Sequence, residues 1–189
     1  MKLKWSKARG TARMMAGAGI GLLLAGAAVA QLVVGAPAPD FKTMGAIGGQ
    51  TFRLHLAEEL RKGPVVLYFF PRAFTKGCTL ESKAFADAMD RFDAAGARVI
   101  GLSTDSIDRL GRFSKEACGS KVPMAHASDA LLKAYDVELA GVSALVPTAD
   151  RTSYVIGQDG VVTLVHSDLD HKDHVKRTLD AVERLASRD

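Results

Sequence analysis

Residues Val65 to Glu81 read VVLYFFPRAFTKGCTLE, and this stretch decides the fold. It opens with six uncharged apolar residues, Val65 to Phe70, whose β-branched and aromatic side chains indicate a buried central strand. Pro71 ends this strand, because proline has no N–H to donate to a neighbouring strand. A short loop from Arg72 to Gly77 then brings the chain to Cys78.

The residues after Cys78 have the periodicity of a helix. Apolar side chains recur on one helical face, at Phe85, Met89 and Phe92. Cys78 therefore lies where a strand and a loop lead into the start of a helix. The unpaired N–H groups and the helix dipole favour negative charge at such a place, so a thiol there ionises more readily, and the thiolate is the nucleophile.

The spacing of three residues in this stretch adds a chemical signal. Pro71, Thr75 and Cys78 form the pattern P-x-x-x-T-x-x-C, which resembles the active-site signature of the peroxiredoxins. The longer string Gly77-Cys78-Thr79-x-Glu81 is similar to that of their Q-type branch, also called bacterioferritin comigratory protein. The alternative interpretation is an inert cysteine beside an unrelated proline and threonine.

The rest of the chain alternates expected strands and helices, which predicts an α/β fold with a central mixed sheet and helices on both faces. Gly48-Gly49 and Gln158-Asp159-Gly160 have the composition of hairpin turns, and residues 138–150 are interpreted as a loop. The thioredoxin fold has this order, so the resemblance implies a thioredoxin-like fold. The other expected strands span 98–103, 125–127, 152–156 and 161–165, and the other expected helices span 54–62, 107–118, 131–135 and 171–187.

The first 30 residues have the composition of an export signal. Basic residues precede an uncharged stretch, Met14 to Ala30, that is rich in Ala, Gly and Leu and ends in Ala28-Val29-Ala30. This order is typical of a secretory signal peptide, here of the Sec type because no twin arginine is present. Since the apolar character continues to Val34, an uncleaved membrane anchor is the alternative. Both interpretations export the remaining chain, to the periplasm or to the periplasmic side of the membrane.

One domain of ordinary size is expected after this leader. Residues 31–37 are interpreted as a linker and residues 38–189 as the domain, whose opening Ala38-Pro39-Asp40-Phe41 resembles the start of a peroxiredoxin domain. The formal net charge of +4 comes from the leader, because without its five basic residues the 20 basic and 21 acidic residues that remain give −1. A surface for nucleic acid or another polyanion is therefore not indicated.

The resemblance implies a role for each of five residues. Cys78 attacks the peroxide and becomes a sulfenic acid, while Pro71 shields its thiolate from water. Thr75 and Arg151 are the candidate donors to the peroxide oxygens, and Glu81 is expected to pair with Arg151. The alternatives are a surface arginine at a strand end for Arg151, and for Glu81 a first-turn acid that is favourable to the helix dipole.

Regeneration of Cys78 requires another thiol. Many Q-type members have a resolving cysteine five residues further along the same helix, but Lys83 occupies that position here. Others have it in the next helix, where Cys118 falls. The resemblance therefore implies an intramolecular Cys78–Cys118 disulfide that a thioredoxin-type dithiol reduces. The alternative is a buried, inert Cys118, with an external thiol reducing the sulfenic acid directly.

Three histidines near the C-terminus suggest a metal site only superficially. His166, His171 and His174 lie among acidic residues, which resembles a metal-binding tract. The same pattern is typical of a solvated loop and a helix start, with Asp170 as the N-cap. We therefore expect neither a metal nor another cofactor.

Three functions from different classes are compared. The favoured one is a thiol peroxidase, a monomer or weak homodimer with a peroxide as substrate and a thioredoxin-like protein as reductant. An exported thiol–disulfide oxidoreductase normally carries C-x-x-C, and Thr75 stands where its first cysteine would be. The third is a non-enzymatic binding module, on the membrane only if the leader is not cleaved. Peroxide consumption separates the first from the others, and insulin-disulfide reduction identifies the second.

Overall fold

The fold is seen in a computed structural model that describes residues 32–139 and 147–187. The expected signal peptide or anchor, residues 1–30, lies outside these ranges. The strands of the described residues are β1 (Lys42–Ile47), β2 (Gln50–His55), β3 (Val65–Phe69), β4 (Arg98–Ser103), β5 (Met124–His126), β6 (Thr152–Ile156) and β7 (Val162–Ser167). The helices are α1 (Leu56–Leu60), α2 (Lys76–Ala94), α3 (Ile107–Cys118), α4 (Asp129–Ala134), the short 3-10 helix η1 (His171–Asp173) and α5 (His174–Ala186).

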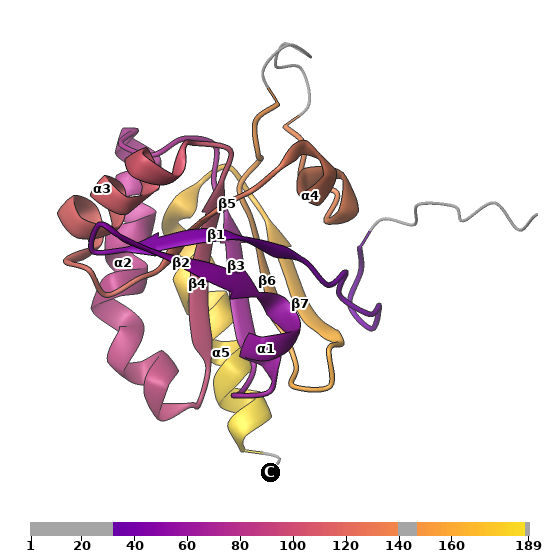
Figure 1. Ribbon diagram of the computed structural model, residues 1–189. Coiled ribbons are helices and arrows are strands. Elements are labelled where there is room, and N and C mark those ends of the chain that lie inside the picture. The colour runs from indigo at the N-terminus through magenta and orange to yellow at the C-terminus, as the bar shows by residue number, and fades with distance from the viewer. Residues whose placement is uncertain (1–31, 140–146, 188–189) are drawn as a thin grey trace, which may run out of the picture.

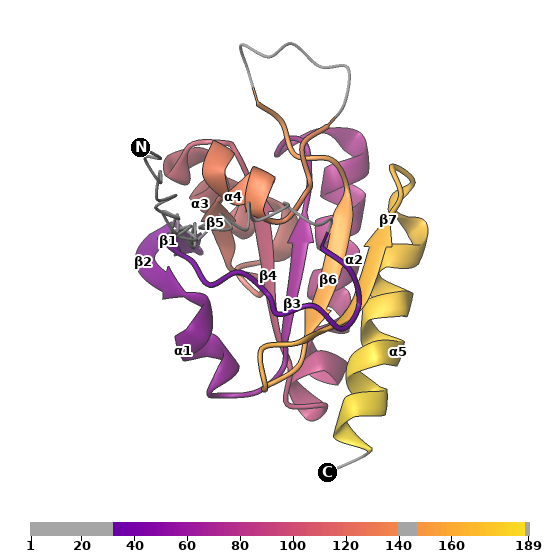
Figure 2. The same cartoon turned by 90° about the vertical axis from the view of Figure 1, so that its right-hand side faces the viewer.

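The strands form one mixed sheet in the order β2-β1-β5-β4-β3-β6-β7. The pairs β3–β4 and β4–β5 are parallel, and the other neighbouring strands are antiparallel. Helices α2, α3 and α5 cover one face, while α1 and α4 cover the other (Figures 1 and 2). The α/β fold with a mixed sheet and helices on both faces is therefore confirmed.

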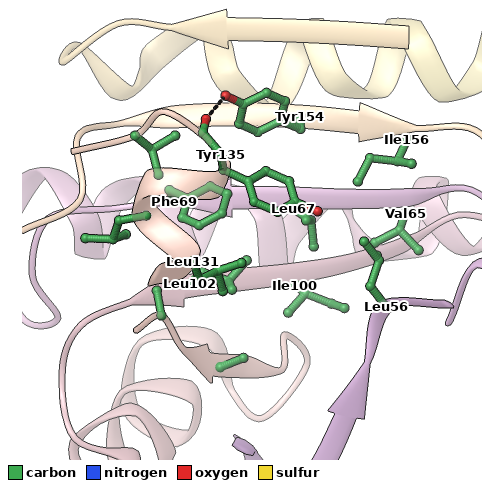
Figure 3. Close-up of a cluster of buried hydrophobic side chains, with 14 of the residues drawn as sticks. Leu56, Val65, Leu67, Phe69, Ile100, Leu102, Leu131, Tyr135, Tyr154 and Ile156 are labelled. Carbon is green, nitrogen blue, oxygen red and sulfur yellow. Dashed lines mark hydrogen bonds between the residues drawn. The ribbon is translucent and has the colours of Figure 1, made fainter. Parts of the chain in front are cut away.

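Strand β3 is buried on both faces, as its apolar run predicts. Val65, Leu67 and Phe69 point into the core beneath α1 and α4, which Figure 3 shows together with Tyr154 and Tyr135. The intervening residues Val66 and Tyr68 belong to the core beneath α2, α3 and α5. Because side chains alternate along a strand, one short run contributes to both cores.

Both hairpin turns are present where the sequence predicts them. Gly48 and Gly49 connect β1 to β2 with φ of 56° and 87°, a left-handed pair that favours glycine. Gly160 has φ of 81° in the turn between β6 and β7. The helix expected from residue 54 begins only at Leu56, because Leu54 still pairs with Thr43 across the β1–β2 ladder.

The segment before β1 lies against the domain. Gly35 N–H donates to the carbonyl of Val162 at 2.8 Å, and Ala38 N–H donates to the carbonyl of Gly160 at 2.9 Å. Leu32 is buried in the core beneath α1 and α4. These contacts fasten most of the expected linker, residues 32–37, to the edge of the sheet near β7. Among the described residues, no helix has the length and apolar character needed to cross a membrane.

Candidate active site

Cys78 is the third residue of α2 and is almost fully buried, with 1% of its surface exposed. Thr75, the residue immediately before α2, has the extended backbone of an N-cap, with φ of −77° and ψ of 153°. The chain therefore turns from β3 through a short loop directly into the helix. This geometry confirms the predicted placement of the thiol in the first turn, where N–H groups without helical partners favour an anion.

Arg151 reaches this thiol because β6 lies beside β3 in the sheet. The antiparallel register pairs Phe69, at the end of β3, with Thr152, at the start of β6. Arg151, one residue before β6, is thereby placed next to the start of α2. Its Nη2 lies 3.5 Å from Cys78 Sγ, and its Nε donates to the carbonyl of Leu169 at 2.9 Å. The guanidinium is thus fixed at two points and only 6% exposed.

Glu81 completes this group from the same helix as Cys78. It lies three residues further along, so both side chains share one helical face, and it forms an ion pair with Arg151 Nη1. Glu81 is completely buried. Burial raises the pKa of Glu81 to about 8, while the neighbouring Arg151 acts in the opposite direction. One guanidinium therefore contacts both the thiol sulfur of Cys78 and the carboxyl of Glu81.

A buried histidine lies behind Glu81, and the sequence pattern associated it only with a metal-binding tract. His174 Nε2 is 2.9 Å from the carbonyl of Asp168, and its Nδ1 is 2.8 Å from Ser153 Oγ. A carbonyl can only accept, so Nε2 carries the proton and Nδ1 accepts from the serine hydroxyl. Burial lowers the pKa of His174 to about 4, which keeps the ring neutral near pH 7. Glu81 Oε1 lies 3.7 Å from Nδ1.

The periodicity of α5 contains the signal that locates this histidine. The buried face of the helix includes Thr178, Ala181 and Val182. Extending that face by one turn toward the N-terminus arrives at His174. The acidic residues around it drew attention to metal binding instead. Within the described residues, no three His, Cys, Asp or Glu side chains gather as a metal site requires.

Thr75 and Pro71 belong to the segment that connects β3 to α2. The Thr75 hydroxyl is exposed and donates to the carbonyl of Arg72 at 3.0 Å. The hydroxyl proton is engaged in this contact, and the lone pairs of the oxygen remain available to another donor. Pro71 is half-buried at the end of β3. The catalytic roles of both residues stay predictions.

Cys118 is the last residue of α3 and is also buried. It belongs to the same core as Cys78, and both cysteines are free thiols. Burial raises the pKa of Cys118 to about 12. Burial therefore disfavours the thiolate form of Cys118 in this conformation.

Comparisons with known proteins show which sequences resemble this chain. The sequence profile of the AhpC/TSA family matches residues 34–165. Chloroplastic peroxiredoxin Q from Sedum lineare is 36% identical over 124 residues, which are 65% of this chain and 64% of the relative. Its counterpart from Populus jackii is 31% identical over 152 residues, which are 78% of this chain and 67% of the relative.

Solved structures bear out the fold. Peroxidoxin BcpB from Mycobacterium tuberculosis has a TM-score of 0.68 to this chain at 29% identity, over 80% of this chain and 97% of that one. The PrxQ mutant from Xylella fastidiosa has a TM-score of 0.71 at 24% identity, over 82% and 98% of the two chains. These neighbours are peroxiredoxins, so the predicted thioredoxin-like fold and the resemblance to the Q-type branch are confirmed.

Proposed function

The chain belongs to the AhpC/TSA family, and we propose that it is a thiol-dependent peroxidase that reduces hydrogen peroxide or organic hydroperoxides through Cys78. One observation carries this proposal: Arg151 joins Cys78 Sγ, in the first turn of α2, to the buried carboxyl of Glu81. A guanidinium held in this way stabilises a thiolate and offers N–H donors to a second electronegative atom beside it.

The reaction begins with the Cys78 thiolate and a peroxide. The sulfur attacks one oxygen and the O–O bond breaks, so Cys78 becomes a sulfenic acid. The other oxygen leaves with its electron pair, takes up a proton and becomes water or an alcohol. Negative charge moves from sulfur to this leaving oxygen during the step. Donors aimed at that oxygen therefore accelerate the reaction, and Arg151 is the donor that the geometry favours.

Cys118 is our proposed resolving residue. Its thiol attacks the sulfenic sulfur of Cys78, releases water and leaves an intramolecular disulfide, which a thioredoxin-type dithiol reduces. Cys118 is only 3% exposed, which supports an opening of α3 before this attack, because exposure to water also favours the thiolate form. Opening of this kind is a local event that leaves the rest of the fold intact.

Intact-mass analysis tests the resolution step. One equivalent of hydrogen peroxide is expected to lower the mass of the reduced protein by about two units without forming a dimer, because a disulfide removes two hydrogens. A peptide linking Cys78 to Cys118 should appear. The Cys118→Ser variant is expected to react once and then stop at the sulfenic acid or over-oxidise. Normal turnover of this variant with a thioredoxin-class dithiol would instead indicate a one-cysteine peroxidase.

We also propose that the protein is exported, on the strength of the leader sequence. The mature chain is expected to begin at or near Gln31 and to occur in the exported soluble fraction, because the signal peptide precedes that residue. N-terminal sequencing of the protein recovered from each cell fraction determines both the first residue of the mature chain and its location. A chain that retains Met1 in the membrane fraction would favour the anchor.

The proposed assembly is a monomer or weak homodimer. Among the described residues, the exposed large apolar side chains are Val33, Val34, Met44, Leu80 and Leu169. Apart from the adjacent pair Val33 and Val34, they lie in separate parts of the chain. A stable homodimer interface usually requires a larger contiguous apolar patch. The distribution of these side chains therefore supports a weak interface at most.

A further inference from the structure

The loop that carries the chain into the Cys78 helix has a strained backbone. Phe74 has φ of 65°, in the left-handed region that bulky L-residues rarely adopt. Such a conformation persists only where the surrounding contacts impose it. Phe74 lies four residues before Cys78, so whatever holds this residue in place also holds the start of α2.

The backbone just before Phe74 is held from both sides by one ion pair. Ala73 N–H donates to Asp105 Oδ2 at 2.6 Å, and Arg109 Nη2 donates to the carbonyl of Ala73 at 2.7 Å. Arg109 Nε and Asp105 Oδ1 are 3.2 Å apart. We call these two residues the Asp105–Arg109 clamp. Both hydrogen-bonding groups of Ala73 thus depend on side chains 32 and 36 residues away in sequence.

The clamp is itself anchored to the sheet and to the loop side chain. Asp105 Oδ2 accepts from Ser103 Oγ at 3.1 Å, at the end of β4. The guanidinium carbon of Arg109 lies 5.1 Å from the centre of the Phe74 ring. That ring packs edge-on against Phe113, with their centres 5.1 Å apart. Arg109 therefore contacts both the backbone and the side chain of the loop.

Helix α3 carries the clamp residue Arg109 at one end and the proposed resolving thiol at the other. Arg109 is in its first turn, and Cys118 is its last residue. At a rise of 1.5 Å per residue, these two positions are about 14 Å apart along the helix axis. The end of α3 that touches the Cys78 loop is therefore not the end that carries the proposed resolving thiol. While the clamp and the helix keep this arrangement, the loop that leads to Cys78 is tied to the end of α3 opposite to Cys118.

We propose that Asp105 and Arg109 are positioning residues that hold the Cys78 loop in its peroxide-reactive conformation, and that the clamp must open before Cys78 reaches Cys118. This inference rests on the proposed peroxidase function. When the clamp is closed, it keeps Cys78 beside Arg151. When the clamp opens, it releases the strained loop, and the first turn of α2 can then unwind.

The clamp then decides between two fates of the sulfenic acid. In one, the Cys118 thiol attacks the sulfenic sulfur of Cys78, an S–S bond forms and water leaves. In the other, a second peroxide molecule oxidises the sulfenic acid to a sulfinic acid, and the peroxide is reduced to water or an alcohol. A closed clamp prolongs the life of the sulfenic acid and favours the second fate.

The Arg109→Gln variant tests this division. Rapid mixing with hydrogen peroxide, followed by acid quench and intact-mass analysis, measures three quantities: the rate of Cys78 oxidation, the rate of disulfide formation and the fraction of sulfinic acid. We expect oxidation to slow several-fold and disulfide formation to accelerate about tenfold. The peroxide concentration that gives half over-oxidation should rise accordingly. Asp105→Asn keeps an acceptor for Ala73 N–H but loses the charge, so it should shift all three quantities less.

Arg112→Gln is the matched control. Arg112 lies on the same helix with its guanidinium carbon 5.8 Å from the centre of the Phe74 ring, and that ring contact is its only described contact with the loop. We expect both rates to stay within twofold of those of the unmodified protein. The proposal is overturned if Arg109→Gln and Arg112→Gln behave alike, if both steps slow together, or if no disulfide forms in the unmodified protein. Failure of the unmodified protein to consume peroxide would instead refute the peroxidase function.

Discussion

The Cys78→Ser variant is expected to consume no hydrogen peroxide above the uncatalysed rate. A serine hydroxyl is far less ionised than a thiol near pH 7, and its oxygen is a much weaker nucleophile toward the O–O bond. Arg151 then has no thiolate to stabilise. The rate of peroxide consumption in the presence of excess dithiol measures this effect, and it is followed by the absorbance of hydrogen peroxide. We expect the loss of activity to be the largest that any single substitution in the chain produces.

Cys118→Ser is the matched control, because it replaces the other buried thiol by the same residue. It should keep the first reaction with peroxide at the original rate. In the Cys78→Ser variant the serine oxygen still offers an acceptor to Arg151 Nη2. We therefore expect thermal unfolding to show that the free energy of unfolding of this variant falls by less than about 2 kcal/mol. Substantial peroxidase activity in a folded Cys78→Ser protein would remove Cys78 from the reaction.

The strand, loop and helix around Cys78 could be predicted because their signals are local. The apolar run of β3 is continuous, proline marks its end, and the helical period of α2 begins directly after the loop. Each signal involves residues that are close in sequence, so their types and their spacing alone are enough to recognise it. The hairpin turns were predictable for the same reason, since glycine is the residue that accepts positive φ without strain.

The neighbours of Cys78 could not be derived in this way, because they come from distant parts of the chain. Arg151 is 73 residues away in sequence, and its contact depends on the register between β3 and β6. No periodicity in the sequence encodes which strand pairs with β3. The resemblance to a family supplied this residue, and the structure shows how the sheet brings it to the thiol.

The polar group behind the site shows the same limit. His174 packs behind Glu81 only because α5 lies across α2 and β6, a tertiary arrangement. The orientation of the Thr75 hydroxyl toward Arg72 is set by the loop backbone, which the motif spacing does not describe. The family resemblance therefore indicates some of the residues around the thiol, but not the hydrogen bonds that they make.

Arg151→Ala is expected to slow the oxidation of Cys78 by on the order of a hundredfold or more, the usual effect of removing a donor aimed at developing charge. Arg151→Lys should recover at most about tenfold of that loss. The guanidinium serves three acceptors at once, Cys78 Sγ, the carboxyl of Glu81 and the carbonyl of Leu169, and an ammonium group lacks this fork. Rate constants from rapid mixing measure both variants. Arg72→Ala is the control, because it removes an exposed arginine from the adjacent loop and should change the rate less than twofold.

The Arg151→Ala/Glu81→Gln double variant separates two ways in which Arg151 could act. Removing the arginine alone leaves Glu81 fully buried without its cation, so the carboxyl is expected to hold its proton to a higher pH and the fold to lose stability. Glutamine at position 81 cannot ionise, and it should restore much of the thermal stability. If Arg151 stabilises the thiolate and the leaving oxygen, the double variant remains slow although it is stable. If the double variant regains the original rate, Arg151 serves only to neutralise Glu81, and the donor to the peroxide must be another group.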